Sequence, residues 1–474
     1  MRSRLLSGAM IALALVTAPA AALAQTPATA PAAASAGFQV QPTYYTLDNG
    51  LRVVLLRDAA VPTATVGVYY GIGFRIEPRD RTGFAHLFEH LLFQGSEHAE
   101  KGVFIDLVTN SGGAMNGSTR FDFTNYYEVV PSGALEAILW GEADRMARPV
   151  INQEVLENQQ GVVANEVRVN VINQPYGGWP WLDLPQAANT NWYNAHNFYG
   201  ELDDLEAATV EDARTFHEQF YRPNNAVLVV AGDIDEAQTR AWIDRYFGSI
   251  PGGEPVVLPD ISEPRQEEAK FVVRQDPLAP RPAWSAGYHA PPRGTPEWYA
   301  MGLIDQLLVQ GADSRLYDKL VRQEGLTGSV MGGINIGLGN MFNYNGPMLW
   351  TLALIHDGET SHETVTAAVD EVVNDLIARP VSQAELDRAR TKIRSGLYSV
   401  VDSGTRFGLV DLLAVYALFD DDPSAVNEIE AGFAAVTPEL IQQVAAEYLR
   451  PTNRTILIVE PGAAPAAAAS EAAQ

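Results

Sequence analysis

The chain has 474 residues, of which 47% are hydrophobic and 19% are charged, and it contains no cysteine. This length and composition exclude a disordered protein and allow two or more domains with cores of their own. The lack of cysteine excludes disulfide bonds and thiolate metal sites, so any metal has to be bound by histidine and carboxylate side chains. The formal net charge of −26 gives a surface that repels nucleic acid and anionic lipid. We therefore expect neither of them as a partner.

The N-terminal residues have the features of an export signal. Arg2 and Arg4 precede an apolar stretch that is too short for a confident membrane span, and Ala-Leu-Ala at 22–24 satisfies the small-x-small rule for cleavage. We expect residues 1–24 to be a signal peptide that is cleaved after Ala24, and the mature protein to be periplasmic. No later segment is apolar over the length of about eighteen residues that a span needs, so we expect no membrane span.

Strand and helix patterns alternate in the first half of the chain. Strands are predicted for the β-branched stretches RVVLLRD (52–58), TATVGVYYGIG (63–73) and TNYYEVVP (124–131). Helical periodicity follows in GALEAILWGEADRM (133–146). The short connection within MNGSTRFDFTNYYEVV (115–130) favours antiparallel pairing of its two arms.

The chain also repeats itself. TVEDARTFHEQFYRPNNAVLVVAGD begins at Thr209 and TPELIQQVAAEYLRPTNRTILIVEPG begins at Thr437. In both, an N-cap threonine opens an amphipathic helix, and Arg-Pro and an asparagine precede a β-branched strand. EHLLFQGS, which ends at Ser96, aligns in the same way with DQLLVQGA around Gly311. We therefore predict an α+β fold of two duplicated domains, each a mostly antiparallel sheet with helices packed on one face.

The repeat sets the expected domain limits. A Pro/Gly-rich stretch joins the two copies, and Ala/Pro/Ser-rich stretches with nothing to bury flank them. The expected order is a signal peptide (1–24), an Ala/Pro-rich linker (25–38), an N-terminal domain with the candidate site (39–250), an interdomain linker (251–270), a homologous C-terminal domain (271–460) and a disordered tail (461–474).

Two histidines and a glutamate lie inside one apolar helical pattern, TGFAHLFEHLLFQGS. The second copy has Gly302 and Gln306 in place of His86 and His90, so the fold itself does not need the histidines. The second copy is therefore expected to lack the metal ligands.

The spacing of these side chains suits a metal site. On a helix, His86 and His90 lie one turn apart on the same face and can bind one cation. Glu89 lies at the edge of that face, where it can reach a water at the metal. Imidazole and carboxylate groups suit Zn²⁺, but a catalytic zinc needs a third protein ligand.

H-x-x-E-H is the inverzincin motif, and over residues 39–460 the sequence resembles the pitrilysin/insulinase family of zinc metallopeptidases. The resemblance implies that a glutamate about seventy-five residues downstream completes the zinc site. Glu166, in NQQGVVANEVRVN, has 75 residues between it and His90. The resemblance thus implies one Zn²⁺ per chain on His86, His90 and Glu166, with Glu89 as the catalytic base.

Two departures from the family's pattern affect the expected activity. Gln159 stands where the family usually has a second glutamate that supports the site, and a neutral amide adds no negative charge there. The Arg/Tyr pair that the family uses to bind the substrate and to stabilise the oxyanion is replaced by Val321 and Gly328. The chain thus resembles the zinc-bearing subunit of a two-subunit bacterial member, completed in a heterodimer by a related subunit that lacks H-x-x-E-H. Arg322 or Tyr344 taking the place of the pair is the alternative.

Two further segments are rich in glycine. SGGAMNGSTRFDFTNYYEVV resembles the family's G-G-x-x-N-A-x-T segment, in which an edge strand pairs with an extended peptide. We expect Asn116 and Gly117 to contact the substrate, and the alternative is that this Asn-Gly pair forms a turn. The glycines of MGGINIGLGN (331–340) do not form a phosphate loop, because no Lys-Ser/Thr follows them.

Taken together, these features predict a zinc metalloendopeptidase subunit that hydrolyses peptides or unfolded polypeptides in the periplasm. One alternative is a non-catalytic peptide-binding or assembly subunit of the same fold. A second alternative is a metallohydrolase with a different substrate. The intact H-x-x-E-H motif and Glu166 favour the endopeptidase.

Overall fold

The computed structural model describes residues 37–462. The predicted signal peptide (1–24) and nearly all of the predicted linker (25–38) and tail (461–474) lie outside the described residues. Residues 38–462 belong to one compact unit. Within the described part of the chain, no helix is both long and apolar enough to cross a membrane.

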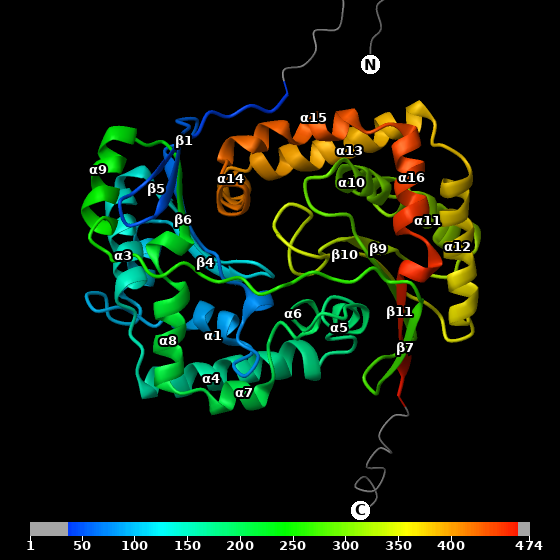
Figure 1. Ribbon diagram of the computed structural model, residues 1–474, viewed down its shortest axis with the longest axis horizontal. Coiled ribbons are helices and arrows are strands. Elements are labelled where there is room, and N and C mark those ends of the chain that lie inside the picture. Colours follow the sequence, from blue (N-terminus) through cyan, green and yellow to red (C-terminus); the bar gives the residue numbers. More distant parts are fainter. Residues whose placement is uncertain (1–36, 463–474) are drawn as a thin grey trace, which may run out of the picture. The chain divides into compact units, whose positions relative to one another are not determined.

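The first sheet has its strands in the order β1-β2-β6-β3-β5-β4. The strands are β1 (Thr43–Thr46), β2 (Arg52–Arg57), β3 (Thr63–Tyr70), β4 (Ala114–Thr119), β5 (Thr124–Pro131) and β6 (Ala226–Gly232). β2 and β6 run parallel, and the other neighbouring pairs are antiparallel. The predicted hairpin is β4–β5, and it places β4 at an edge of the sheet (Figure 1).

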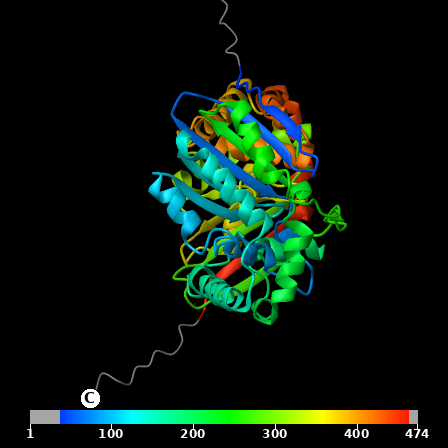
Figure 2. The ribbon, with the colours of Figure 1, turned by 90° about the vertical axis from the view of Figure 1, so that its left-hand side faces the viewer.

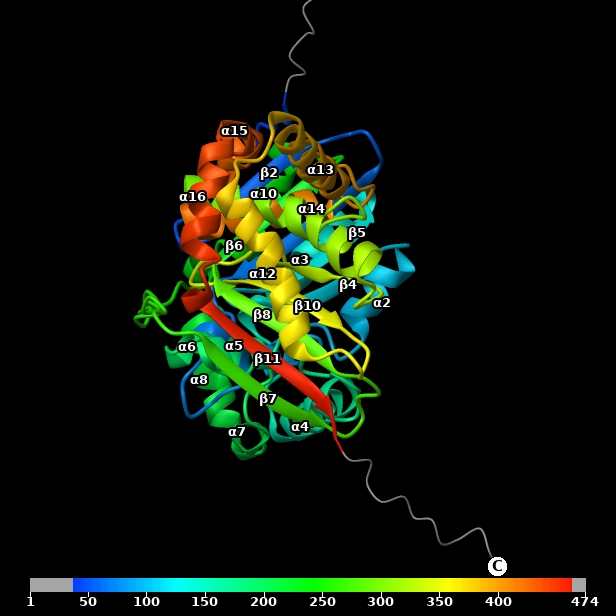
Figure 3. The same cartoon turned by 90° about the vertical axis from the view of Figure 1, so that its right-hand side faces the viewer.

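The second sheet repeats this topology in the order β7-β11-β8-β10-β9. Its strands are β7 (Lys270–Asp276), β8 (Ala283–His289), β9 (Met331–Ile334), β10 (Leu349–Ile355) and β11 (Arg454–Pro461). β7 and β11 run parallel, and the other neighbours are antiparallel (Figure 3). The common topology confirms the predicted α+β fold of two duplicated, mostly antiparallel sheets. The domain limits stay a prediction.

Sixteen α-helices occur in the described residues. Those of the first half are α1 (Phe84–Leu91), α2 (Val103–Asn110), α3 (Leu135–Ala147), α4 (Gln153–Val167), α5 (Asp183–Ala188), α6 (Trp192–Ala195), α7 (Leu202–Ala207), α8 (Val210–Phe220) and α9 (Glu236–Phe247). Those of the second half are α10 (Pro296–Leu308), α11 (Arg315–Tyr317), α12 (His362–Ala378), α13 (Gln383–Val401), α14 (Phe407–Asp420), α15 (Ile429–Ala435) and α16 (Pro438–Tyr448). As predicted, Thr209 and Thr437 are the N-caps of α8 and α16, and each side chain accepts a hydrogen bond from a backbone N–H of the first turn.

Helices of both halves cover the sheets. One face of the first sheet packs against α1 and α3 of its own half (Figure 2), and the opposite face packs against α14 of the second half. In the same way, α5 of the first half covers one face of the second sheet, where Leu184 packs near Leu457. The central strands require this cover because both of their faces are apolar, and every residue of β6 is buried. The prediction of helices on one face thus holds for each half's own helices, and the other face is closed by the opposite half.

Candidate metal and catalytic site

Helix α1, which carries the two histidines, begins at a buried carboxylate. Glu77 accepts hydrogen bonds from the backbone N–H groups of Gly83 (2.9 Å) and Ala85 (2.5 Å). Burial raises the pKa of Glu77, and His196, at 3.7 Å, and the two N–H groups oppose that rise. A carboxylate at this end of a helix satisfies free amide donors and interacts favourably with the helix dipole. Glu77 therefore fixes the start of the metal-binding helix.

His86 and His90 of α1 meet Glu166 of α4, because the two helices pack against each other. Ligand atoms of the three residues all lie within 4.8 Å of one another. Glu166 places one oxygen 3.3 Å from His90 Nε2 and the other 3.7 Å from His86 Nε2. Tetrahedral zinc with bonds of about 2.1 Å holds neighbouring ligand atoms about 3.4 Å apart. The three side chains therefore fit the ligand set of one zinc ion.

Burial and mutual contacts set the charge of these ligands. Burial lowers the pKa of His86 to about 4, Glu166 opposes this fall and His90 adds to it. His86 is therefore a neutral imidazole at neutral pH, as a metal ligand has to be, and its contact with Glu166 is not an ion pair. The pKa of Glu166 is lowered, chiefly by its hydrogen bond with His90. The cluster thus offers neutral nitrogen from His86 and a carboxylate from Glu166.

Glu89 lies beside the cluster and is held from β4. Thr119 Oγ1 donates a hydrogen bond of 2.7 Å to Glu89 Oε2. Burial raises the pKa of Glu89, and this hydrogen bond opposes the rise. A carboxyl with a raised pKa is suited to accept and then return a proton near neutral pH.

Three residues around the cluster escaped the sequence analysis. Tyr199 donates its hydroxyl to Glu166 Oε1 at 3.2 Å, and its ring packs against His86 with centroids 5.1 Å apart. Thr119 is the last position of the G-G-x-x-N-A-x-T segment, so that motif contained a signal for it. Tyr199 and Glu77 have no such local signal.

Asn116 and Gly117 lie inside strand β4, so the alternative that they form a turn is wrong. Gly117 faces α1, since a Cβ atom there would lie 3.2 Å from Glu89 Cγ. Asn116 is exposed, and its Oδ1 accepts a hydrogen bond of 2.9 Å from the N–H of Gly117. The structure thus brings β4 beside Glu89, and the contact of Asn116 and Gly117 with substrate stays a prediction.

The other sequence candidates do not join the cluster. Gln159 is buried on α4, and its amide donates to the side chain of the preceding asparagine at 2.7 Å. Among the described residues, no hydrogen bond links Gln159 to the three ligands. Tyr344 is fully buried and accepts a hydrogen bond of 2.8 Å from Trp298 Nε1. Arg322 is exposed and lies 3.8 Å from Asp318. In the described part of the chain, neither Arg322 nor Tyr344 contacts the three ligands, and the alternative that one of them replaces the Arg/Tyr pair stays a prediction.

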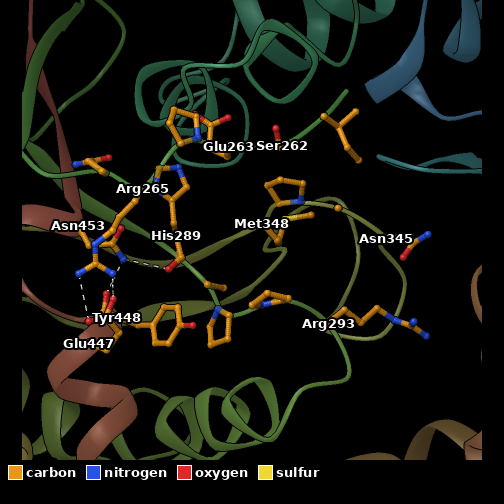
Figure 4. Close-up of a pocket in the computed structure, with 18 of the residues that line it drawn as sticks. Ser262, Glu263, Arg265, His289, Arg293, Asn345, Met348, Glu447, Tyr448 and Asn453 are labelled. Atoms are coloured by element: carbon orange, nitrogen blue, oxygen red, sulfur yellow. Dashed lines mark hydrogen bonds and ion pairs between the residues drawn. The ribbon is translucent and has the colours of Figure 1, made fainter. Parts of the chain in front are cut away.

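A cavity of about 750 Å³ is a separate feature of the molecule (Figure 4). Its walls are formed by residues 259–266, 289–293 and 345–348 and by the C-terminal end of α16 with the residues that follow it. Glu447 in its wall already pairs with Arg265 and with Arg450. None of the residues of the metal cluster lines this cavity.

A helix-borne H-x-x-E-H motif completed by a carboxylate from a second helix is the arrangement of an inverzincin metallopeptidase. The family model described as insulinase (peptidase family M16) matches residues 52–176, and the model described as the peptidase M16 inactive domain matches residues 207–393. The chain belongs to the pitrilysin/insulinase family, peptidase family M16, which confirms the resemblance found in the sequence.

Relatives of this chain are named as zinc proteases. The zinc protease PqqE of Helicobacter pylori is 26% identical over 429 residues, which cover 88% of this chain and 92% of PqqE. The uncharacterized zinc protease ML0855 of Mycobacterium leprae is 26% identical over 362 residues, which cover 74% of this chain and 77% of that protein.

Solved structures share the fold. A protease from Helicobacter pylori superimposes with a TM-score of 0.82 at 23% identity and covers 90% of this chain and 100% of its own. A peptidase M16 inactive domain from Pseudomonas fluorescens has a TM-score of 0.78 at 17% identity, with 90% of this chain and 99% of that chain covered. The periplasmic protease PqqL from Escherichia coli has a TM-score of 0.70 at 17% identity, and the match covers 90% of this chain but 48% of PqqL.

Proposed function

We propose that this chain is the zinc-binding subunit of a periplasmic endopeptidase that hydrolyses peptides or unfolded polypeptides. The observation that carries the proposal is the convergence of His86, His90 and Glu166 on one point, with Glu89 beside them. The names of the zinc protease relatives support the choice of metal and reaction.

The residues of the cluster divide the work of peptide hydrolysis. When bound, zinc acidifies a coordinated water and polarises the peptide carbonyl. Glu89 accepts the proton of the attacking water and delivers it to the leaving amine. Thr119 orients the Glu89 carboxylate through its 2.7 Å hydrogen bond, and Tyr199 orients Glu166. These orienting bonds keep the reacting carboxylate at a fixed distance from the ligands.

Strand β4 is the proposed binding site for the substrate backbone. It is an edge strand, and Thr119 at its end contacts the catalytic carboxylate. An extended peptide that adds to this edge would be held by main-chain hydrogen bonds, largely regardless of its sequence. Asn116 is exposed on the strand and Gly117 lies next to Glu89, so both are proposed to line the peptide near the scissile bond.

A partner subunit is part of the proposal because the oxyanion-stabilising pair is missing. Tyr344 is buried in the core and Arg322 is exposed beside Asp318, which supports a partner rather than these two residues as the source of the pair. A homodimer would not help, since both copies lack the same groups. The chain spans about half the length of PqqL, which is named a periplasmic protease, and this supports a second, related subunit and an export signal at 1–24.

The alternative is a non-catalytic peptide-binding or assembly subunit. It is favoured by the match of residues 207–393 to a domain described as inactive. That match, however, covers the part of the chain without candidate ligands. His86, Glu89, His90 and Glu166 all lie within 52–176, the range matched by the insulinase model, and this supports the catalytic role.

Zinc content and peptide hydrolysis test the proposal together. The purified chain should hold about one zinc, and His90→Ala should lose most of it, because one of three protein ligands is removed. An unstructured fluorogenic peptide should be cleaved rapidly only after the related subunit is added. Stoichiometric zinc in His90→Ala would overturn the ligand assignment. Full turnover by the isolated chain, unchanged by the partner, would overturn the heterodimer.

A further inference from the structure

The loop between β9 and β10, residues 335–348, is braced by its own asparagines. Asn335 is buried and has a left-handed backbone with a φ of 60°, which is rare for a residue other than glycine. Its Nδ2 donates to Asn340 O and to Asn343 Oδ1, both at 3.2 Å. Asn343 Oδ1 also accepts the N–H of Asn340 at 2.8 Å. A strained residue held by several bonds indicates a loop whose shape is specified rather than adaptable.

This loop is hydrogen-bonded to the turn that follows the edge strand β4. Arg120, the first residue after β4, donates from Nη1 to the carbonyl of Leu338 at 2.9 Å. In the same turn, Asp122 Oδ2 accepts the backbone N–H of Asn345 at 2.7 Å. These two bonds join the end of the proposed substrate strand to the second half of the chain.

A buried arginine makes a third connection to the same turn. Arg75 pairs with Asp122 at 2.6 Å and donates to the carbonyl of Pro347 at 3.0 Å. Gly346 allows this approach, because a Cβ atom there would lie 2.9 Å from Arg75 Cζ. The other side of this segment, with Asn345 and Met348, forms part of the cavity wall in Figure 4.

The loop also supports the metal ligands indirectly, through two aromatic side chains that pack between them. Gly337, with a φ of +87°, lies so close to Trp181 that a Cβ atom would be 2.5 Å from Trp181 Cβ. Trp181 packs edge-on against Tyr199 with ring centroids 6.1 Å apart. Tyr199 in turn contacts both His86 and Glu166. Two neighbouring residues of the loop, Gly337 and Leu338, therefore support the ligand side and the substrate side of one site.

We propose that the β9–β10 loop is a positioning element for the candidate active site, with Arg120 and Gly337 as its points of attachment. The proposal rests on the proposed function. It assigns a role in the site to the second half, which lacks metal ligands, and to the glycine-rich stretch 331–340, which does not form a phosphate loop. An edge strand has hydrogen-bonding partners on one side only, so a support at its end restricts the motion that would displace a bound peptide.

Arg120→Ala tests the substrate side. In the zinc-free protein, amide hydrogen exchange in residues 114–119 should become about tenfold faster, because a charge-assisted bond that holds the strand is lost. With the active complex, KM for the peptide should rise about five- to tenfold with kcat within about twofold of wild type. Arg120→Lys should restore both in part. Arg222→Ala, which removes a similar arginine bond to Glu218 O, should change neither.

Gly337→Ala tests the ligand side. It should weaken zinc binding about tenfold in a chelator competition, because the new methyl group displaces Trp181 and with it Tyr199. Gly294→Ala is the matched control, since Gly294 has a φ of +79° and no atom within 4 Å of an added Cβ. An equal effect in both glycine variants would assign the loss to backbone strain and overturn the role of Gly337.

Unchanged exchange and KM in Arg120→Ala would overturn the role of the loop at the substrate strand. Circular dichroism of each variant shows whether the fold is kept. If Gly337→Ala does not fold, the result for Arg120→Ala alone tests the positioning role of the loop. Failure of the proposed function is distinguishable, because it would appear as a wild-type chain without zinc binding or hydrolysis. The exchange measurement in the zinc-free protein depends on neither property.

Discussion

Replacing Tyr199 with phenylalanine tests the support of the metal ligands. The Tyr199 hydroxyl donates to Glu166 Oε1 at 3.2 Å, and the ring packs against His86. Tyr199→Phe removes the hydroxyl and keeps the ring, so it separates the hydrogen bond from the packing. We expect the fold to be unchanged and zinc to be bound more weakly.

The expected size of this effect follows from the geometry. A hydrogen bond to a charged group contributes about 1.5–3 kcal/mol. The bond of 3.2 Å is long for a hydroxyl donor, and the Glu166 side chain is 27% exposed, so the lower limit applies. About 1.4 kcal/mol corresponds to a tenfold change in an equilibrium constant. We therefore expect the zinc dissociation constant to rise about tenfold, within the range found for residues that orient metal ligands.

Competition with a chelator of known zinc affinity at fixed pH measures this constant. Tyr193→Phe is the control, because the Tyr193 ring lies 5.1 Å from the Arg79 guanidinium and, within residues 37–462, Tyr193 does not contact the three ligands. Equal zinc affinity of Tyr199→Phe and wild type would refute the reasoning that Tyr199 orients Glu166.

Three further predictions concern Glu89 and two buried titratable groups. Glu89→Gln should keep zinc but lower kcat at least about 100-fold, because an amide cannot accept the proton. Elemental analysis measures the zinc content and a peptide assay measures kcat. Loss of zinc with an unchanged circular dichroism spectrum would show that Glu89 is a ligand instead. Burial lowers the pKa of His217 to about 4. The unfolded chain therefore binds a proton more readily than the folded chain, so the free energy of unfolding is highest above about pH 6.5 and falls as the pH falls toward 4. In urea unfolding, His217→Gln should therefore lose about 2 kcal/mol less than wild type between pH 7 and pH 5, and an identical pH dependence would contradict this. Burial raises the pKa of Asp305 to about 6. The effect of Asp305 on the pH dependence is opposite, because its contribution to the free energy of unfolding is present below about pH 4 and is lost as the pH rises through 6. Asp305→Asn keeps an acceptor for the 3.0 Å bond from Trp350 Nε1 and should be about 1–3 kcal/mol more stable at pH 7.5, whereas a less stable variant would show that the charge is needed.

Local rules accounted for what the sequence determined by itself. The N-caps Thr209 and Thr437 were predictable because capping depends on residues three positions apart. His86 and His90 were placed on one face because the helical period requires it. The repeat showed the duplication, and therefore the two similar sheets. Glu166 was found only through the resemblance to a family, since no local pattern links it to α1.

Only the tertiary structure decided which distant residues complete the site. The structure joins Tyr199 to Glu166 and Arg120 to Leu338. Tyr199, Arg120 and Leu338 lie outside helices and strands, and such irregular segments carry no periodic signal from which a partner can be read. For a related reason, the sequence did not show that α14 of the second half covers the first sheet and that α5 of the first half covers the second sheet. An apolar strand face indicates burial, but the hydrophobic effect is non-directional, so the strand pattern does not name the helix that covers it. The path of the whole chain makes that choice, and here it also brings the half without metal ligands against the half that carries them.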